Sequence, residues 1–312
     1  MKGLRKAEDI SVTGKTTLRE LAREYEKSGG FVAKKLGTAV QIMEGMLSEK
    51  GCVRILSFPA CIISTGTRGL IKEAVKRKMF DIVITTCGTL DHDFARVWKD
   101  YYHGSFDADD AELHRKGINR LGNIFIPNDS YGQIIEDRLQ PILKDIYDSG
   151  KKELSTYELV WEIGKRIEGE KSAEGSIIHW AAKNRIPVII PGITDGAFGT
   201  QLMMFMQKHR DFRVDVFRDE QLLFERLFSK VRSGALMIGG GISKHHVIWW
   251  NQFKGGLDYA VYVTTAPEWD GSLSGARMKE AVSWGKVKEK ARYITVEGDA
   301  TVLLPLILGP FL

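Results

Sequence analysis

The segment at residues 280–286, EAVSWGK, holds the residue types best suited to covalent chemistry. It places Lys286 two positions after Trp284, with a glycine between them, and six positions after the carboxylate of Glu280. A lysine attacks a carbon atom only when its amine is partly unprotonated, and burial against an aromatic face or a nearby positive charge favours that form. Lys286 is therefore a candidate for a residue that forms an imine. A solvated lysine at the end of a helix is the alternative interpretation.

His245 is a second candidate for chemistry. It follows the glycine triplet at 239–241, so we expect it in the first turn of a helix. There the helix dipole disfavours an imidazolium ion and leaves a neutral proton acceptor. A packed or surface histidine pair, His245 with His246, is the alternative interpretation, because adjacent helical residues lie about 100° apart and seldom bind one metal.

No group of residues predicts a metal ion. Asp91, His92 and Asp93 are consecutive, and three consecutive helical residues cannot converge on one ion. We interpret them as a solvated helix start. The three cysteines lack CxxC spacing, which argues against both a thiolate metal site and a disulfide framework.

The composition is that of a cytoplasmic α/β protein. The 312 residues are 43% hydrophobic, enough for a large core in one big domain or two smaller ones. The 45 basic and 40 acidic residues are spread along the chain without a basic block, which argues against nucleic-acid binding. The N-terminus has no apolar leader, and the longest apolar run, 302–312, is about half a membrane span, so no membrane association is expected.

The pattern of apolar residues predicts helices first and then a parallel sheet. Residues 15–50 have apolar side chains at helical spacing, with a break at Gly29 and Gly30. Beyond them, short apolar runs alternate with helical segments, which indicates parallel strands covered on both faces. The predicted fold is a Rossmann-like α/β catalytic domain over 51–312, preceded by a helical segment, 1–50, packed on it. The predicted strands are 53–56, 81–85, 124–126, 188–190, 235–238 and 259–263.

Small or hydroxyl residues follow most of these strands. In parallel sheets, ligands bind beyond the carboxyl ends of the strands, where loops meet helix N-termini. The glycine triplet at 239–241 would let backbone N–H groups approach a phosphate, although a tight turn with no ligand explains it too. We expect a nucleotide-sized ligand, with Asp195 or Asp299 accepting hydrogen bonds from ribose hydroxyls. The loops are 64–66, 85–88, 194–196, 239–241, 264–266 and 298–300.

The order of these segments along nearly the whole chain resembles that of the deoxyhypusine synthase family. The matching landmarks are 63–68, 81–88, 117–123, 126–128, 194–196, 239–246, 258–262, 275–277 and 280–286. The resemblance implies a cytoplasmic, NAD-dependent transferase of hypusine biosynthesis, a homotetramer with shared active sites. Such an enzyme oxidises spermidine, forms an imine between its aminobutyl group and an enzyme lysine, and passes that group to one lysine of the translation factor 5A precursor.

The resemblance also assigns roles by position. Lys286 resembles the lysine that forms the imine, and His245 the proton acceptor. Trp284 resembles the aromatic wall beside that lysine, and Glu280 the carboxylate that holds an amine of the polyamine. The implied substrate-binding residues are Glu280, Trp284, Asp91, Gly271, Ser272 and Asn128. The implied NAD-binding residues are Ser64, Thr86, Cys87, Gly88, Asp195, Gly240, Thr265, Ala266, Asp270, Asp299 and Ala300.

Three positions depart from the eukaryotic pattern. Thr200 and Leu273 stand where those members have carboxylates that bind the polyamine, and His92 replaces another acidic residue. Each lost carboxylate removes a charge-assisted hydrogen bond of about 1.5–3 kcal/mol. Two alternatives follow: transfer to a small amine, as in homospermidine synthase, or an NAD-binding paralogue without turnover.

Overall fold

The chain divides into two compact units. The computed structural model describes residues 4–228 and 232–312. Unit 1 comprises Met1–Ser57 and Glu225–Leu312, and unit 2 comprises Phe58–Phe224. The predicted helical segment 1–50 corresponds to two helices of unit 1, α1 (Leu18–Ser28) and α2 (Phe31–Ser48). The domain boundary expected near residue 50 stays a prediction.

Unit 1 contains four parallel strands. In the order β11-β10-β9-β1, they are β11 (Val287–Glu297), β10 (Leu257–Thr264), β9 (Ser233–Ile238) and β1 (Val53–Phe58). Every residue of β9 is buried, as expected for a strand that is covered on both faces. The other helices of unit 1 are α11 (Gly241–Gln252), α12 (Glu280–Ser283) and α13 (Ala300–Leu308).

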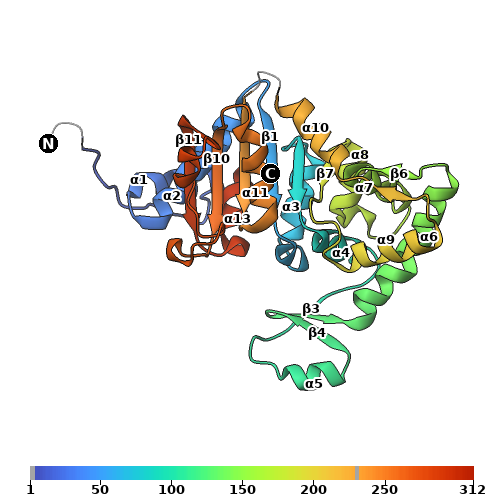
Figure 1. Ribbon diagram of the computed structural model, residues 1–312. Coiled ribbons are helices and arrows are strands. Elements are labelled where there is room, and N and C mark those ends of the chain that lie inside the picture. Colours follow the sequence, from blue (N-terminus) through green and yellow to red (C-terminus); the bar gives the residue numbers. More distant parts are fainter. Residues whose placement is uncertain (1–3, 229–231) are drawn as a thin grey trace. The chain divides into compact units, whose positions relative to one another are not determined.

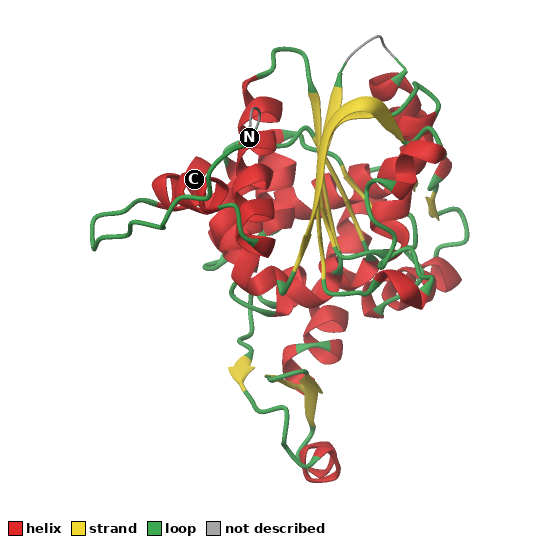
Figure 2. Cartoon of the chain, turned by 90° about the vertical axis from the view of Figure 1, so that its left-hand side faces the viewer, coloured by secondary structure: helices red, strands yellow, loops and turns green. Residues whose placement is uncertain are grey.

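Helices cover both faces of these strands. Tyr259 and Tyr262 are three residues apart in β10, so their side chains point to opposite faces. Tyr259 donates a hydrogen bond to Glu49, at the C-terminal end of α2. The ring of Tyr262 lies under Lys244 of α11. Thus α2 and α11 lie on opposite sides of the strands, and the predicted α/β class is confirmed. Figure 2 shows helices on both sides of the strands.

Unit 2 has two parallel strands and contains more α-helices than unit 1. Strands β2 (Ile82–Thr85) and β7 (Val188–Ile189) pair in parallel. The helices are α3 (Arg68–Lys76), α4 (Cys87–Ala95), α5 (Asp110–Arg115), α6 (Gly132–Asp148), α7 (Thr156–Arg166), α8 (Ile177–Asn184), α9 (Ala197–Lys208) and α10 (Phe217–Leu227), the last ending beyond the unit boundary. The short strands β6 (Glu153–Leu154) and β8 (Arg213–Val214) form a separate pair. Figure 1 labels these helices and the strands β6 and β7.

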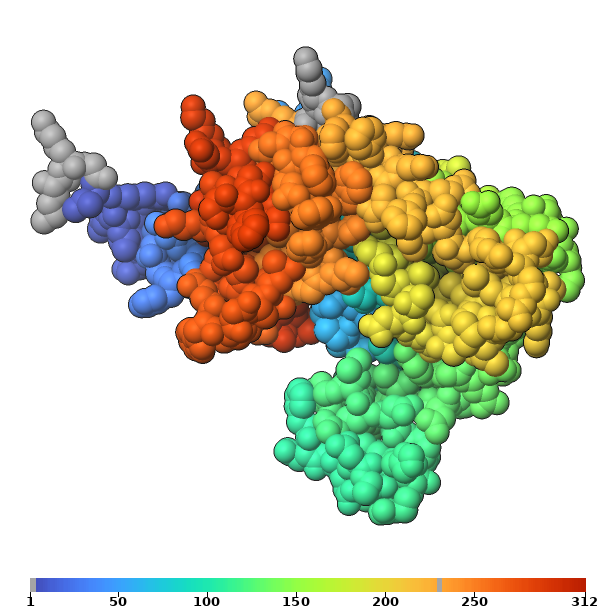
Figure 3. Space-filling model, viewed as in Figure 1, coloured from blue at the N-terminus to red at the C-terminus, as the bar shows by residue number. Residues whose placement is uncertain are grey.

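The strand predicted at 124–126 is present, but it does not belong to the predicted parallel sheet. It is β5 (Ile124–Pro127), which pairs antiparallel with β4 (Ile118–Leu121) and β3 (Tyr102–His103) in a sheet of its own. Only Gly122 and Asn123 join β4 to β5, and a two-residue turn can connect antiparallel strands only. Gly122 has φ 61°, which suits such a turn. With α5, this sheet forms a separate lobe of unit 2, coloured cyan to green in Figure 3.

Asp91 and Asp93 hold the N-termini of two other helices. Both carboxylates are buried, at 1% and 0% exposure, so the expected solvated helix start is wrong. Asp91 accepts hydrogen bonds from the first two backbone N–H groups of α9, at 3.1 and 2.7 Å. Asp93 accepts from two N–H groups of α8, at 3.0 and 2.9 Å, and from Arg68 Nε at 2.7 Å. Each carboxylate thus complements a helix dipole and its unpaired donors.

Replacing Asp93 with alanine is expected to lower the free energy of unfolding by about 3–5 kcal/mol, because Arg68 would remain buried without its partner. Urea unfolding measures this loss. The control is Asp110→Ala, which breaks an exposed pair with Arg120 and is expected to cost far less, because solvent screens that pair. Equal losses in the two variants would contradict the role given to Asp93.

The described residues contain no candidate for a membrane-spanning helix. None of the helices in 4–228 and 232–312 is both long and apolar enough to span a bilayer.

Candidate functional site

A cavity of about 230 Å³ in unit 1 brings together four residues that the sequence singled out. Lys286, Trp284, Glu280 and His245 all line it. Helix α11 provides one wall, and α12 with the turn that follows it provides another. The remaining lining residues are Lys244, Ile248, Leu273, Ala276, Arg277, Met278 and Ala281.

Lys286 is buried beside an exposed tryptophan. Its side chain is 9% exposed, and its Nζ lies 5.2 Å from the ring centroid of Trp284. Gly285, between them, has φ 68°, a conformation that places the two side chains on the same side of a tight turn and that few other residues adopt easily. The indole is 67% exposed, so it covers the amine on one side and faces solvent on the other. The solvated alternative does not describe this lysine, and its chemical role stays a prediction.

His245 lies on α11, at the start of the second turn and not in the first turn as expected, because α11 begins at Gly241. Burial, with help from the nearby positive charge of Lys286, lowers the pKa of His245 below its usual value. Its ring stacks on Trp249, with centroids 5.7 Å apart. This shift favours the neutral imidazole, the form that a proton acceptor requires.

Lys244 is a residue of this cavity that the sequence analysis passed over. It is 1% exposed, and its Nζ donates hydrogen bonds to the carbonyl oxygens of Leu273 and Ala276, both at 2.7 Å. The signal in the sequence is helical spacing, because Lys244 occupies the same helix face as the buried residues Val247 and Ile248. A lysine in an apolar stripe indicates a buried amine with specific acceptors.

Lys244 makes the stability of the fold depend on pH. Burial lowers its pKa from the ordinary 10.5 to about 7, against an opposing effect of Glu280. Between these two values the unfolded chain holds a proton that the folded protein has lost, so folding is favoured as the pH rises. We expect the free energy of unfolding of the wild type, relative to Lys244→Met, to increase from pH 7 toward pH 10. Urea unfolding across that range measures it, and a constant difference would contradict the shift.

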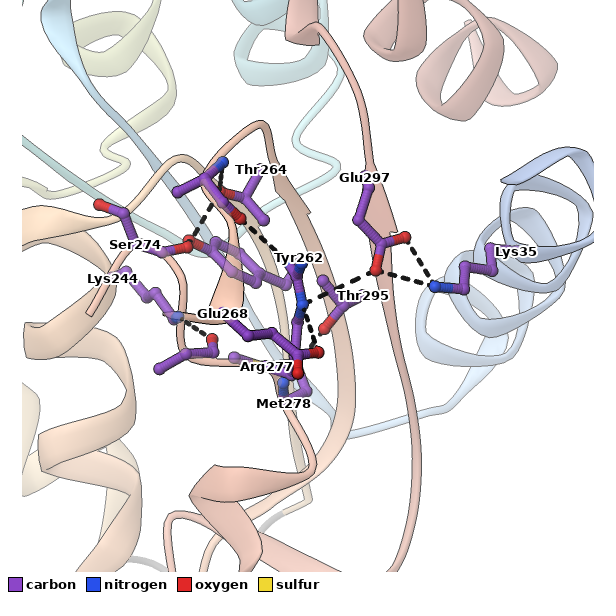
Figure 4. A network of polar contacts seen from close by, with 12 residues as sticks. Lys35, Lys244, Tyr262, Thr264, Glu268, Ser274, Arg277, Met278, Thr295 and Glu297 are labelled. Carbon is purple, nitrogen blue, oxygen red and sulfur yellow. Dashed lines mark hydrogen bonds and ion pairs between the residues drawn. The ribbon is translucent and has the colours of Figure 1, made fainter. Parts of the chain in front are cut away.

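Arg277 anchors the segment that leads into α12. Its guanidinium contacts Glu268 at 2.9 Å and Glu297 at 3.7 Å, and it donates to the carbonyl oxygen of Ala266 at 3.2 Å. Glu297 in turn pairs with Lys35 of α2 at 2.7 Å (Figure 4). This network links the end of β11 and the loop after β10 to the cavity wall.

The predicted NAD-binding residues of unit 1 follow the carboxyl ends of three adjacent strands. Gly240 follows β9, Thr265 and Ala266 follow β10, and Asp299 with Ala300 follows β11. A Cβ atom at Gly240 would lie 2.1 Å from Ser274 Oγ, so the chain leaves no room for a side chain there.

The carboxylates of Asp270 and Asp299 are exposed, and each also accepts a hydrogen bond from a nearby backbone N–H group. Asp299 caps α13 through the N–H of Thr301, at 2.8 Å. Asp270 accepts from the N–H of Ser272 at 2.7 Å, and the neighbouring Gly271 has φ 66°. Both carboxylates are exposed and able to accept further hydrogen bonds.

The remaining predicted residues lie in unit 2. Thr86, Cys87 and Gly88 follow β2, and Asp195 follows β7. A Cβ atom at Gly196 would lie 2.8 Å from Cys87 Sγ, so these two loops are in close contact. Burial, with the charge of Asp91, raises the pKa of Cys87 to about 12, which keeps it a thiol.

Three predicted positions of unit 2 already have partners. Ser64 donates to the carbonyl oxygen of Cys61 at 2.7 Å, and Asn128, which is exposed, accepts from Asn119 at 2.9 Å. Asp91 accepts from the Tyr131 hydroxyl at 2.6 Å, in addition to its contacts with α9. The predicted site residues therefore form two groups, one in each unit.

The comparison with protein families decides the classification. The deoxyhypusine synthase family model matches residues 20–310. The chain belongs to the deoxyhypusine synthase family. This confirms the resemblance inferred from the sequence, and with it the enzyme class, a transferase.

Two related proteins agree with this membership. A Picrophilus torridus protein named "Probable deoxyhypusine synthase" is 56% identical over 304 residues, covering 97% of this chain and 96% of the relative. One of the same name from Thermoplasma acidophilum is 54% identical over 308 residues, covering 99% and 97%.

Two crystal structures share the fold. One is described as a candidate deoxyhypusine synthase from Entamoeba histolytica, with TM-score 0.63 and 22% identity over 97% of this chain and 95% of that one. The other is AgrE in complex with ornithine and NAD+, with TM-score 0.53 and 12% identity over 90% of this chain and 33% of that one. At these identities the likeness concerns the fold alone.

Proposed function

We propose that this member of the deoxyhypusine synthase family transfers the aminobutyl group of spermidine, through an imine on Lys286, to a lysine of the translation factor 5A precursor. The observation that carries the proposal is the buried amine of Lys286, placed against Trp284 in a cavity that Glu280 and His245 also line. NAD is the proposed cofactor, and the cytoplasm the proposed location.

The proposed cofactor and these residues account for each bond that forms or breaks in the reaction. When bound, NAD would supply the oxidant, a hydride acceptor for the carbon next to the secondary amine of spermidine, and the reductant for the imine that later forms on the acceptor lysine. The amine of Lys286 attacks that carbon, and the carbon–nitrogen bond to the diaminopropane part breaks. His245, held neutral, takes the proton that the attacking amine releases. The amine of the acceptor lysine then displaces Lys286 from the same carbon, which frees Lys286 for the next turnover.

Two further residues prepare the substrate. Glu280 is exposed at the cavity, where its carboxylate accepts hydrogen bonds from an ammonium group of the polyamine. Trp284 shields the amine of Lys286 from water on one side, which slows hydrolysis of the imine.

The residues after β9, β10 and β11 fit a dinucleotide. Gly240 stands at the start of α11, where backbone N–H groups suit a phosphate. The exposed carboxylate of Asp299 suits ribose hydroxyls. AgrE, which shares the fold, was crystallised with NAD+. The proposed ligands of unit 2 are Ser64, Thr86, Cys87, Gly88 and Asp195.

We propose self-association for the exposed aromatic face of α11. Ile242, Trp249 and Phe253 are 42–48% exposed and lie on one side of the helix that lines the cavity. An apolar patch of this kind fits the homotetramer with shared active sites that the family resemblance implies.

One feature of the cavity favours a different acceptor, a small amine. Leu273 lines the cavity and gives it an apolar wall where the resemblance implies a carboxylate. With one carboxylate fewer, the cavity suits a different amine, so transfer to a small amine, as in homospermidine synthase, is the alternative function.

The experiment that tests the proposed function follows a labelled aminobutyl group. The protein is incubated with NAD, labelled spermidine, and either the factor 5A precursor or putrescine. We expect label on one lysine of the precursor. Label found only in a small polyamine would reject the protein acceptor and support the alternative.

A further inference from the structure

We propose that Lys244 is a positioning residue whose side chain fastens the segment Leu273 to Ala276 onto α11 and so sets the wall of the cavity that faces Lys286. The proposal rests on the proposed function, because the reaction at Lys286 is where its effect is measured. Lys244 itself is assigned no bond-making step.

The contacts of Lys244 select an amine at this position. Its Nζ donates to two backbone carbonyl oxygens, of Leu273 and Ala276, each at 2.7 Å. The same atom lies 3.7 Å from the centroid of the Tyr262 ring, at a face that attracts a positive charge. Burying an amine costs free energy unless its N–H groups are paired. The two carbonyl acceptors therefore explain why a lysine is tolerated at this buried position.

The segment between those carbonyls is fixed by two further donors from β10. The Tyr262 hydroxyl and the Thr264 hydroxyl both donate to the carbonyl oxygen of Ser274, at 2.6 and 2.9 Å (Figure 4). Gly275 fits closely against Pro267, because a Cβ atom there would lie 2.1 Å from the Pro267 carbonyl oxygen. The segment is therefore held by one residue of α11 and by two residues of β10.

This segment bears directly on the reacting amine. Leu273 and Ala276 line the same cavity as Lys286, and so does Lys244. The charged groups that face Lys244 are Glu280, Arg277 and Lys286, from α12, the segment before it and the turn after it. A shift of the segment would move the wall against which the amine donor lies, and a misplacement of about 1 Å can reduce a rate by about 100-fold.

The matched variants are Lys244→Met and Lys254→Met. Lys244 is buried and Lys254, just after α11, is half-buried, and burial lowers the pKa of both lysines. Lys254 is not among the residues that line the cavity. We expect Lys244→Met to slow the capture of spermidine at Lys286, at saturating spermidine, by about 10- to 100-fold. Lys254→Met is expected to stay within about twofold of the wild type.

Two more measurements separate positioning from a loss of stability. Lys244→Arg retains donors for both carbonyls and is expected to recover part of the rate. In hydrogen exchange without substrate, the amides of 273–276 are expected to exchange faster in Lys244→Met and unchanged in Lys254→Met. If Lys244→Met does not fold, Tyr262→Phe, which removes one donor to Ser274, is expected to show a smaller change in both readouts.

The outcomes distinguish this proposal from the proposed function. Capture at the wild-type rate by Lys244→Met, or unchanged exchange of 273–276, would overturn the role of Lys244. A spermidine adduct on Lys244 in the wild type would overturn it too, by making Lys244 a nucleophile. If the wild type captures no spermidine while exchange of 273–276 still depends on Lys244, the proposed function fails and the anchoring of the segment stands.

Discussion

Replacing Lys286 with alanine is expected to abolish transfer, with a loss of about 10⁴-fold or more, because no other group would form the imine. Lys286→Arg is expected to fail equally, since a guanidinium keeps its charge at all accessible pH values and does not attack carbon. NAD affinity should remain close to the wild type, because this lysine acts in the chemical step. Steady-state transfer and equilibrium NAD titration measure the two properties separately.

The control for this variant lies in β11, the strand that directly follows Lys286. Lys290 is exposed on β11, four residues beyond Lys286, and lines no part of the cavity among the described residues. Lys290→Ala is expected to retain full activity. The assignment of Lys286 would be contradicted by substantial transfer in Lys286→Ala, or by a parallel loss of NAD binding in that variant.

Glu280→Gln has the second largest expected effect, a loss of about 10- to 100-fold in kcat/KM for spermidine. The amide keeps the size of the side chain but lacks the charge, so a charge-assisted hydrogen bond of about 1.5–3 kcal/mol to the ammonium is lost. Glu289→Gln, at an exposed position of β11, makes the same chemical change outside the cavity and is expected to have no effect. Steady-state kinetics on the two variants measure the difference.

Spermidines acetylated at one end or the other refine this experiment. The acetylated end carries no ammonium, so the donor that lacks the group bound by Glu280 should react equally with wild type and Glu280→Gln. If the substitution affects both acetylated donors and spermidine alike, Glu280 acts through something other than an ammonium, and its assignment fails.

The local part of the site could be predicted from the sequence. Trp284 and Lys286 are two residues apart, and the glycine between them permits the turn that brings them together. Continuous apolar runs, which result from burial on both faces, predict β1, β2, β7, β9 and β10. They do not predict β11, because its first half is rich in charged residues. The loops after them follow from the parallel arrangement.

Contacts between distant residues could not be predicted. Lys244 depends on carbonyls 29 and 32 residues away, and Asp93 on N–H groups 84 and 85 residues away. Spacing along the chain indicates that such polar residues lie on a buried face, but not which groups pair with them. The direction of β5 was missed for a different reason, because an apolar run of three residues carries no information about its partner strand.

Trapping with borohydride tests the central claim most directly. The protein is incubated with NAD and spermidine, reduced with borohydride, digested, and analysed by peptide mass spectrometry. We predict a four-carbon amine adduct on Lys286. No adduct on any lysine, or an adduct on another lysine with Lys286 unmodified, would contradict the account.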